Sequence, residues 1–173
     1  MRSFQGFIVA SFLCLPAVAQ AEVKPRVLGW VENIRIEEVD LNLKAKLDTG
    51  ATTSSIDAEV LDIKKTGERK KGDTGETIVF SMTDDDGVKK RVFERKVVRY
   101  VRIKKKGGAG YIRRPVVEMT FCLGGRLTKE EVNLANRENF IYPVLVGRNM
   151  LQHAEILVDA SRTFVSRPVC GKK

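Results

Sequence analysis

The chain has 173 residues, of which 43% are hydrophobic, so it is long enough for one domain with a buried core. Its formal net charge of +9 at pH 7 favours acidic partners. The basic residues lie in short runs rather than on one platform interleaved with aromatic residues, so we do not expect nucleic acid as a partner. These runs are better explained as solvated hairpin ends and strand edges: Lys64-Lys65, Arg69-Lys70-Lys71, Lys89-Lys90-Arg91 and Lys104-Lys105-Lys106.

Residues 1–21 have the pattern of a secretory signal peptide. Arg2 gives a basic start, residues 7–18 form an apolar stretch, and Ala19-Gln20-Ala21 places small residues before a cleavage point. The apolar stretch is too short to span a bilayer comfortably and no second candidate follows, so we expect no membrane span after cleavage. The sequence therefore predicts an exported protein, periplasmic or secreted, in which residues 22–173 form a single domain.

Two cysteines remain once Cys14 leaves with the signal peptide. An oxidising compartment permits one disulfide between Cys122 and Cys170, which would tie the C-terminal tail to a late strand. Two buried free thiols are the alternative, and the sequence does not choose between the two states.

From residue 27 onward the sequence is mostly strand-like. Leu41, Leu43, Ala45 and Leu47 alternate with polar residues, which is the period of a strand with one buried face. Regular turn signals between short strands predict an all-β barrel or sandwich. We expect strands, in chain order, over residues 27–36, 41–47, 54–61, 77–82, 92–103 and 115–123, with closing strands over residues 155–159 and 163–165.

The second half of the chain holds one ambiguous segment and one candidate helix. Thr128 and Glu131 fit a helical capping box, yet Val132 and Leu134 also fit a strand. Residues 149–154 are the best candidate for a short helix. Turns and loops are predicted over residues 64–75, 84–87, 104–110 and 124–125, and residues 140–146 form an apolar stretch.

The most informative motif is Leu47-Asp48-Thr49-Gly50-Ala51, an aspartate in a tight turn directly after an apolar strand. In such a turn Gly50 allows close backbone approach, and the Thr49 hydroxyl can lock the backbone by hydrogen bonding. Peptide hydrolysis by carboxylates needs two of them sharing one proton, because at about 3 Å they cannot both ionise. Asp48 is therefore the candidate catalytic residue, and it needs a partner carboxylate.

Asp73-Thr74-Gly75 is a second copy of the tripeptide. Lys70-Lys71-Gly72 precedes it in place of an apolar strand, and Glu76 follows it. It also lies too near Asp48 in the chain to belong to a second lobe. We interpret it as a polar turn without a catalytic role.

Two further motifs accompany the first Asp-Thr-Gly turn. Val144-Leu145-Val146-Gly147-Arg148-Asn149-Met150-Leu151 places Gly-Arg-Asn between apolar residues and the candidate helix. Lys106-Gly107-Gly108-Ala109-Gly110-Tyr111-Ile112 is a glycine-rich turn between the two. In order and spacing, the three motifs resemble the active-site loop, the second signature and the flap of the retropepsins, the retroviral-type aspartic peptidases.

Arg114-Pro115-Val116-Val117 and Tyr142-Pro143-Val144-Leu145-Val146-Gly147-Arg148 also resemble a bacterial branch of retropepsin-like proteins, over residues 27–159. Members of that branch are often labelled ATP-dependent zinc proteases. The residues do not support this label, because the chain has no Gly-x-x-x-x-Gly-Lys-Ser/Thr loop and no His-Glu-x-x-His pair. His153 is the single histidine, so we expect no metal and no cofactor.

The resemblance implies the acid-protease fold: a closed β-barrel with one lobe per chain and one short helix near the C-terminus. It implies an aspartic endopeptidase that works as a homodimer, in which Asp48 of each chain activates a bound water. Thr49 would brace the paired loops, and Gly50, followed by Ala51, would contact the substrate backbone. The implied flap and substrate-binding residues are Gly107, Gly108, Gly110 and Tyr111, and the residues that support the loop are Gly147, Arg148 and Asn149.

The chain departs from the viral pattern directly after the active-site turn. Residues 52–54 are Thr, Thr and Ser, where viral retropepsins usually have acids, one of which pairs with the arginine of Gly-Arg-Asn. Arg148 therefore lacks its usual partner. Glu32, Asp57 and Glu59 are the candidates to replace it.

Two other functions stay open at this stage. The protein could be a catalytically silent peptide-binding or adaptor module in the cell envelope, with Asp48 as a structural turn residue. A zinc hydrolase would need bound metal, and the cysteines and the histidine show no close ligand spacing. For an enzyme, the positive charge favours acidic, glutamate-rich peptides as substrates.

Overall fold

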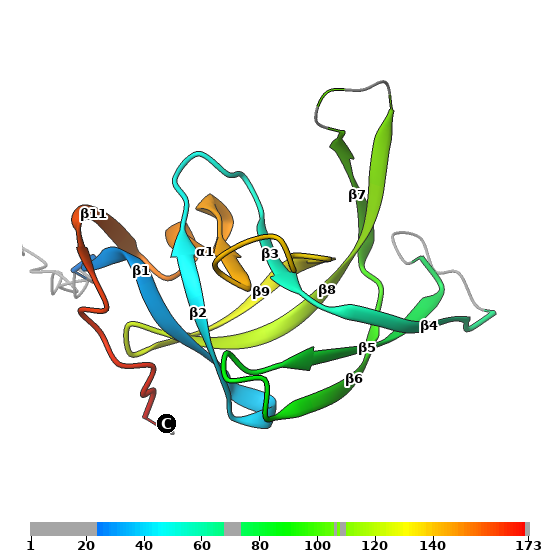
Figure 1. Ribbon diagram of the computed structural model, residues 1–173, viewed down its shortest axis with the longest axis horizontal. Helices are drawn as coiled ribbons and strands as arrows, with labels where there is room; N and C mark the ends of the chain where they lie inside the picture. The colour runs from blue at the N-terminus through cyan, green and yellow to red at the C-terminus, as the bar shows by residue number, and fades with distance from the viewer. Residues whose placement is uncertain (1–23, 68–73, 106, 108–109, 172–173) are drawn as a thin grey trace, which may run out of the picture.

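The computed structural model describes residues 24–67, 74–105, 107 and 110–171, and it shows a mostly β protein with one short α-helix (Figure 1). The predicted signal peptide therefore lies outside the described residues. Within them, no helix is long and apolar enough to cross a membrane.

Six strands close into a mixed barrel. Neighbouring strands follow the order β1, β2, β10, β3, β9 and β8, and β8 pairs back onto β1 through Ile34 opposite Leu123. The predicted closed barrel is thereby confirmed. Its strands are β1 (Arg26–Ile36), β2 (Leu41–Leu47), β3 (Ser54–Asp57), β8 (Tyr111–Leu123), β9 (Arg126–Ala135) and β10 (Val144–Val146).

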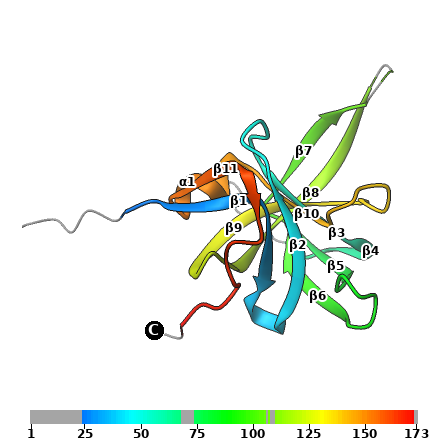
Figure 2. The ribbon, with the colours of Figure 1, turned by 60° about the vertical axis from the view of Figure 1, so that its left-hand side comes forward.

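Two more strands extend the barrel sheet. β11 (Ile156–Thr163) runs parallel to the first half of β1, and β7 (Arg99–Lys104) forms a hairpin with the first half of β8. In both views this hairpin projects from the barrel on the same side as the loop between β2 and β3 (Figures 1 and 2). A single 3-10 turn, η1 (Glu37–Val39), joins β1 to β2.

A separate three-stranded sheet packs beneath the barrel. It consists of β4 (Glu59–Lys65), β5 (Glu76–Thr83) and β6 (Lys90–Lys96), in that order. Phe80 of β5 is fully buried and stacks on Phe93 of β6, with ring centroids 5.1 Å apart. This sheet therefore closes one side of the hydrophobic core.

Two predicted strands are wrong because each divides between the two sheets. Residues 92–103 break at Val97 and Val98: the Val97 N–H donates to Glu76 O of β5, and the Val98 N–H donates to Val116 O of β8, each at 2.9 Å. Residues 54–61 break at Ala58 in the same way, because β3 pairs with β9 and β10 whereas β4 pairs with β5. The predicted loop over residues 64–75 begins later than expected, since β4 continues to Lys65.

Other segments resolve the alternatives that the sequence left open. Thr128 and Glu131 lie in strand β9, not at a helix start. Only the last part of the apolar stretch 140–146 forms a strand, and Phe140 and Ile141 are 54% and 87% exposed. Helix α1 (Arg148–His153) begins one residue before the predicted helix.

The C-terminal segment is attached to the barrel by a disulfide between Cys122 and Cys170. The structure thus shows the disulfide and not the pair of free thiols. Glu32, which is fully buried, adds a second attachment, because its carboxylate accepts the backbone N–H groups of Val165 and Ser166 at 3.0 Å each.

Candidate active site

Asp48 directly follows β2, at the point where β10 lies between β2 and β3. β10 runs parallel to β2 and antiparallel to β3, so it separates the two ends of the active-site loop. The Asp48 N–H donates to Val146 O at 2.8 Å. The loop is therefore held in place by the strand that leads into Gly147.

The two oxygens of the Asp48 carboxylate have different surroundings. Oδ1 accepts the N–H of Gly50 at 2.9 Å and the N–H of Ala51 at 3.2 Å, which fixes the turn. Oδ2 lies 3.8 Å from Lys46 Nζ, and the Asp48 side chain is 28% exposed. Thr49 and Gly50 are both exposed at the surface. Oδ1 thus holds the loop through backbone hydrogen bonds, whereas Oδ2 faces the Lys46 ammonium group.

Gly147, Arg148 and Asn149 lie against this loop. The Arg148 N–H donates to Ala51 O at 2.9 Å, and the Asn149 N–H donates to Thr52 O at 3.2 Å. A Cβ at Gly147 would lie 2.6 Å from the Thr53 carbonyl carbon and 2.7 Å from its oxygen. Glycine is therefore the residue that lets the start of α1 pack on the loop backbone.

The Arg148 guanidinium binds the backbone of the loop and not an acid. Its Nη1 donates to Thr49 O at 2.9 Å and to Gly50 O at 3.0 Å, and its Nη2 donates to Thr52 Oγ1 at 3.0 Å. Among the described residues no carboxylate forms an ion pair with Arg148. The Thr52 hydroxyl therefore accepts a hydrogen bond from Arg148, where we expected an acid as the partner.

The three acids predicted as partners of Arg148 are engaged elsewhere, so that expectation is wrong. Glu32 binds the C-terminal segment. Asp57 Oδ1 accepts the backbone N–H of Arg137 at 2.6 Å. Glu59 pairs with Lys90 at 2.9 Å, and the Lys90 interaction is the largest cause that lowers the pKa of Glu59.

Ser54 is a site residue that the sequence analysis did not identify. It is fully buried, and its Oγ accepts the Gly147 N–H and donates to Asn149 Oδ1, each at 3.0 Å. The sequence signal was present, because Ser54 belongs to the segment that departs from the viral pattern. Lys46, beside Asp48, was also not predicted as a site residue, because the alternating pattern marks it only as a residue on the polar face of the strand.

The predicted flap residues lie at the tip of the β7–β8 hairpin. Gly107 and Gly110 have positive φ angles of 70° and 114°, as a tight turn requires, and the Tyr111 side chain is 56% exposed beneath the Arg102 guanidinium. Gly108 lies outside the described residues.

The second Asp-Thr-Gly lies at the end of the β4–β5 hairpin, with Asp73 itself outside the described residues. Gly75 has a φ of 66°, and its carbonyl accepts the Thr66 N–H at 2.8 Å. The Thr74 hydroxyl donates to Val97 O. These contacts are those of a hairpin turn, as the sequence predicts.

His153 binds a buried acid. Its Nδ1 lies 3.0 Å from both carboxylate oxygens of Glu130, which is 3% exposed, whereas the histidine side chain is 68% exposed. In the part of the chain that the structure describes, no three His, Cys, Asp or Glu residues gather as a metal site.

Two comparisons with known proteins agree with this geometry. The family described as RimB-like, retropepsin-like aspartic endopeptidase RimB, matches residues 27–168. The crystal structure of Lpg0085 from Legionella pneumophila, a protein of unknown function, has a TM-score of 0.64 and 32% identity, and the match covers 82% of this chain and 98% of that one. The chain therefore belongs to the RimB-like family of retropepsin-like aspartic endopeptidases.

Two curated relatives are longer proteins named probable alpha-L-glutamate ligase. They come from Shewanella pealeana and Shewanella halifaxensis, and are 32% and 31% identical to this chain over 125 residues. That stretch is 70% of this chain and 25% of each relative. The match thus spans a quarter of the length of these relatives.

Proposed function

We propose that the protein is an exported aspartic endopeptidase in which two copies of the chain each contribute Asp48 to one catalytic pair. The observation that carries this proposal is the partly exposed Asp48 carboxylate, whose Oδ1 is fixed by two backbone N–H groups while Oδ2 faces Lys46 Nζ at 3.8 Å. Membership of the RimB-like family supports the reaction class.

A second copy supplies the partner carboxylate. A single carboxylate cannot accept a proton from water and donate one to the substrate in the same step, so the reaction needs two. Thr74 and Gly75 of the other Asp-Thr-Gly make the contacts of a hairpin turn between β4 and β5, so we do not take that motif as the source of the partner carboxylate. Thr49 and Gly50, both exposed, are free to meet the same loop of a second copy.

The paired carboxylates hold one water and share one proton. The unprotonated carboxylate takes a proton from the water, whose oxygen attacks the peptide carbonyl carbon. The protonated carboxylate gives its proton to the carbonyl oxygen. Collapse of the gem-diol intermediate breaks the C–N bond. The leaving nitrogen takes the proton of one carboxyl group, and a hydroxyl of the intermediate gives its proton to the other carboxylate, so the pair again holds one proton.

Two observations support an oxidising, exported location. The first is the signal-peptide pattern of residues 1–21. The second is the disulfide between Cys122 and Cys170, a bond that persists mainly outside the reducing cytosol.

Acidic, glutamate-rich peptides are the substrate class that we infer. The net charge of +9 favours substrates of opposite sign. The Shewanella relatives, named as alpha-L-glutamate ligases, support the same class, because enzymes of that name act on glutamate.

The test is a cleavage assay with a peptide library enriched in glutamate. We expect wild type to cleave, Asp48→Asn to lose cleavage, and Asp73→Asn to keep it. Asn keeps the Oδ1 acceptor for the Gly50 and Ala51 N–H groups, so the fold should survive in Asp48→Asn. Full activity in Asp48→Asn would exclude the proposed reaction, and a wild type that binds peptides without cleaving any would favour a binding module.

A further inference from the structure

A row of side chains leads away from Asp48 across one face of the barrel. Lys46 lies opposite Leu145, Leu145 opposite Ser55, and Ser55 opposite Asn133, on strands β2, β10, β3 and β9. Directly paired residues of a sheet point to the same face. Lys46 Nζ lies 3.8 Å from Asp48 Oδ2, so this is the face on which the carboxylate is presented.

Two arginines cover the far end of the row. Arg137 Nη1 donates to Ser55 Oγ at 3.0 Å. Arg114 Nη1 donates to Asn133 Oδ1 at 3.4 Å. One arginine comes from the loop before β10 and the other from the base of the projecting hairpin.

Arg137 is a buried cation without a carboxylate partner. It is 7% exposed, and among the described residues the hydrogen bonds and the ring contact of its guanidinium are to neutral groups: Ser55 Oγ, the Tyr142 carbonyl oxygen at 3.2 Å and the Phe140 ring at 4.5 Å. It forms no ion pair with any described residue. Buried charges in proteins are normally paired, so this arginine has an unused capacity to bind an anion.

The surrounding charges increase this capacity. Burial, followed by the nearby Arg114, lowers the pKa of Arg137, and Asp57 acts in the opposite direction. Arg114 is itself half-buried, and burial lowers its pKa too. The nearest acid along β9, Glu131, is held by Arg99 at 2.7 Å. The two guanidiniums therefore repel each other, and an incoming carboxylate would relieve that repulsion.

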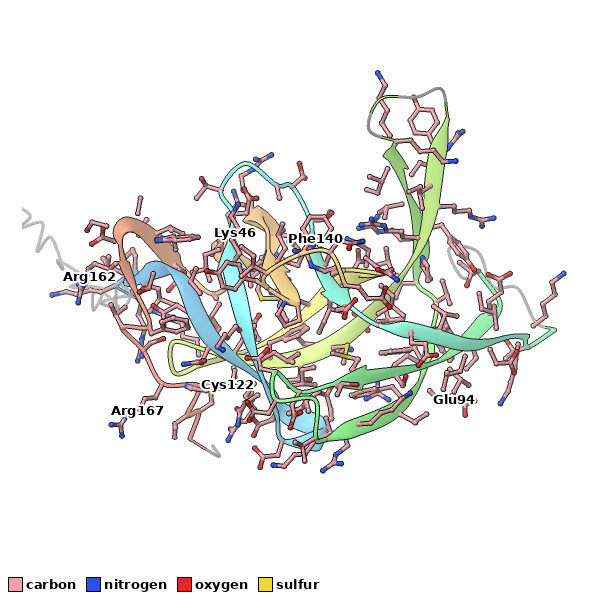
Figure 3. The ribbon with its side chains drawn as sticks, viewed as in Figure 1. Lys46, Glu94, Cys122, Phe140, Arg162 and Arg167 are labelled. Atoms are coloured by element: carbon pink, nitrogen blue, oxygen red, sulfur yellow. A yellow bond between two sulfur atoms is a disulfide. The ribbon has the colours of Figure 1, made fainter. Side chains whose placement is uncertain are left out.

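We propose that Lys46, Arg114 and Arg137 form a carboxylate-recognition row that selects substrates with glutamate or aspartate near the scissile bond. This inference rests on the proposed function and names the residues that set its specificity. Neighbouring strands lie about 4.8 Å apart and an extended peptide advances about 3.3 Å per residue, so the row from β2 to β9 spans about four substrate residues. In Figure 3, Lys46 and Phe140, which packs on Arg137, both lie in the upper middle of the view, whereas Arg162 and Arg167 lie on the left.

The test compares pairs of peptides that differ only by glutamate or glutamine at each of the four positions on either side of the cleaved bond. Glutamine keeps the shape and removes the charge. We expect kcat/KM of wild type to favour glutamate at one or more positions by about tenfold to a hundredfold, the range of a charge-assisted hydrogen bond. In Arg114→Gln and Lys46→Gln, the ratio of kcat/KM for the glutamate peptide to kcat/KM for the glutamine peptide should fall toward one.

A matched control removes one positive charge from outside the row. Arg167 is exposed in the C-terminal segment, and Arg167→Gln should leave the glutamate-to-glutamine ratio at the wild-type value. Arg137→Gln is a weaker probe, because its loss also removes the buried hydrogen bonds to the Tyr142 carbonyl oxygen and Ser55 Oγ, and we expect it to destabilise the fold. Thermal unfolding of each variant shows whether its fold is intact before the ratio is interpreted.

A binding measurement separates failure of the row from failure of the reaction. The Kd of a glutamate-rich peptide is measured for Asp48→Asn and for the double variant that also carries Arg114→Gln. We expect the Kd to be at least tenfold higher in the double variant. The Kd of the matching glutamine peptide should not change in this way. Cleavage by Asp48→Asn would overturn the proposed reaction and leave this binding result standing. The proposed row would be overturned if Arg114→Gln and Lys46→Gln kept the wild-type ratio of kcat/KM for glutamate over glutamine peptides and if Arg114→Gln left the Kd unchanged.

Discussion

The Asn149 side chain joins the helix behind the active-site loop to the Ser54 backbone and hydroxyl. Asn149 Oδ1 accepts both the N–H and the Oγ–H of Ser54, each at 3.0 Å. Its Nδ2 donates to Glu131 O at 3.1 Å. One amide thus links α1, β3 and β9 directly beneath the loop that presents Asp48.

Replacing Asn149 by alanine should therefore destabilise the fold. Asn149→Ala leaves the partly buried groups on Ser54 and Glu131 without their hydrogen-bond partner, and we expect a loss of about 2–4 kcal/mol in the free energy of unfolding. Urea unfolding monitored by circular dichroism measures this loss. Gln152→Ala on the exposed face of the same helix is the control and should change stability by less than about 0.5 kcal/mol. Equal effects of the two substitutions would contradict the role given to Asn149.

Gly147 is required because its position against Thr53 leaves no room for a side chain. We expect Gly147→Ala to cost about 1–3 kcal/mol in stability through overpacking. It should also lower kcat by about a hundredfold, because the loop that carries Asp48 must move away. The control is Gly171→Ala, where an added Cβ meets no atom within 4 Å. Wild-type kcat in a well-folded Gly147→Ala would show that the loop position is not critical.

The β-rich fold class and the active-site loop could be predicted because their signals are local, whereas the closed barrel followed only from the family resemblance. Alternation in β2 predicts one buried face, and the turn at Asp48 follows in the same short stretch. The break between Val97 and Val98 could not be predicted, because both residues suit a strand and only the identity of the partner strand differs. Periodicity describes which face of a strand is buried, but not the sheet in which that strand pairs.

The contacts of the site were harder to predict than its residues. Arg148 was identified, yet two of its partners are the backbone carbonyls of Thr49 and Gly50, which carry no sequence signal. Arg137 approaches Ser55 because the loop before β10 returns across β3, and this proximity depends on the topology. When one strand is inserted between two others, it brings together side chains that are distant in the sequence. Such side chains do not form a sequence motif.

The disulfide between Cys122 and Cys170 should contribute measurably to stability. It closes a loop with a sequence separation of 48 residues. Restricting the unfolded chain by a loop of this length is worth about 2–4 kcal/mol. Reduction with dithiothreitol, or Cys170→Ser, should therefore lower the urea midpoint. Oxidised and reduced protein with the same midpoint would contradict the prediction.

Mixing wild-type chains with Asp48→Asn chains should inhibit the enzyme beyond simple dilution. A mixed dimer holds one carboxylate at the site and cannot share a proton across a pair, so it should be inactive. With random assortment, equal amounts of the two chains leave about half of the wild-type activity, and a tenfold excess of Asp48→Asn leaves about a tenth. Asp73→Asn serves as the control, since its mixed dimers keep both Asp48 carboxylates and the activities should add. Activity that stays at the wild-type level in excess Asp48→Asn would show that each chain works alone, and the partner carboxylate would then have to come from the same chain.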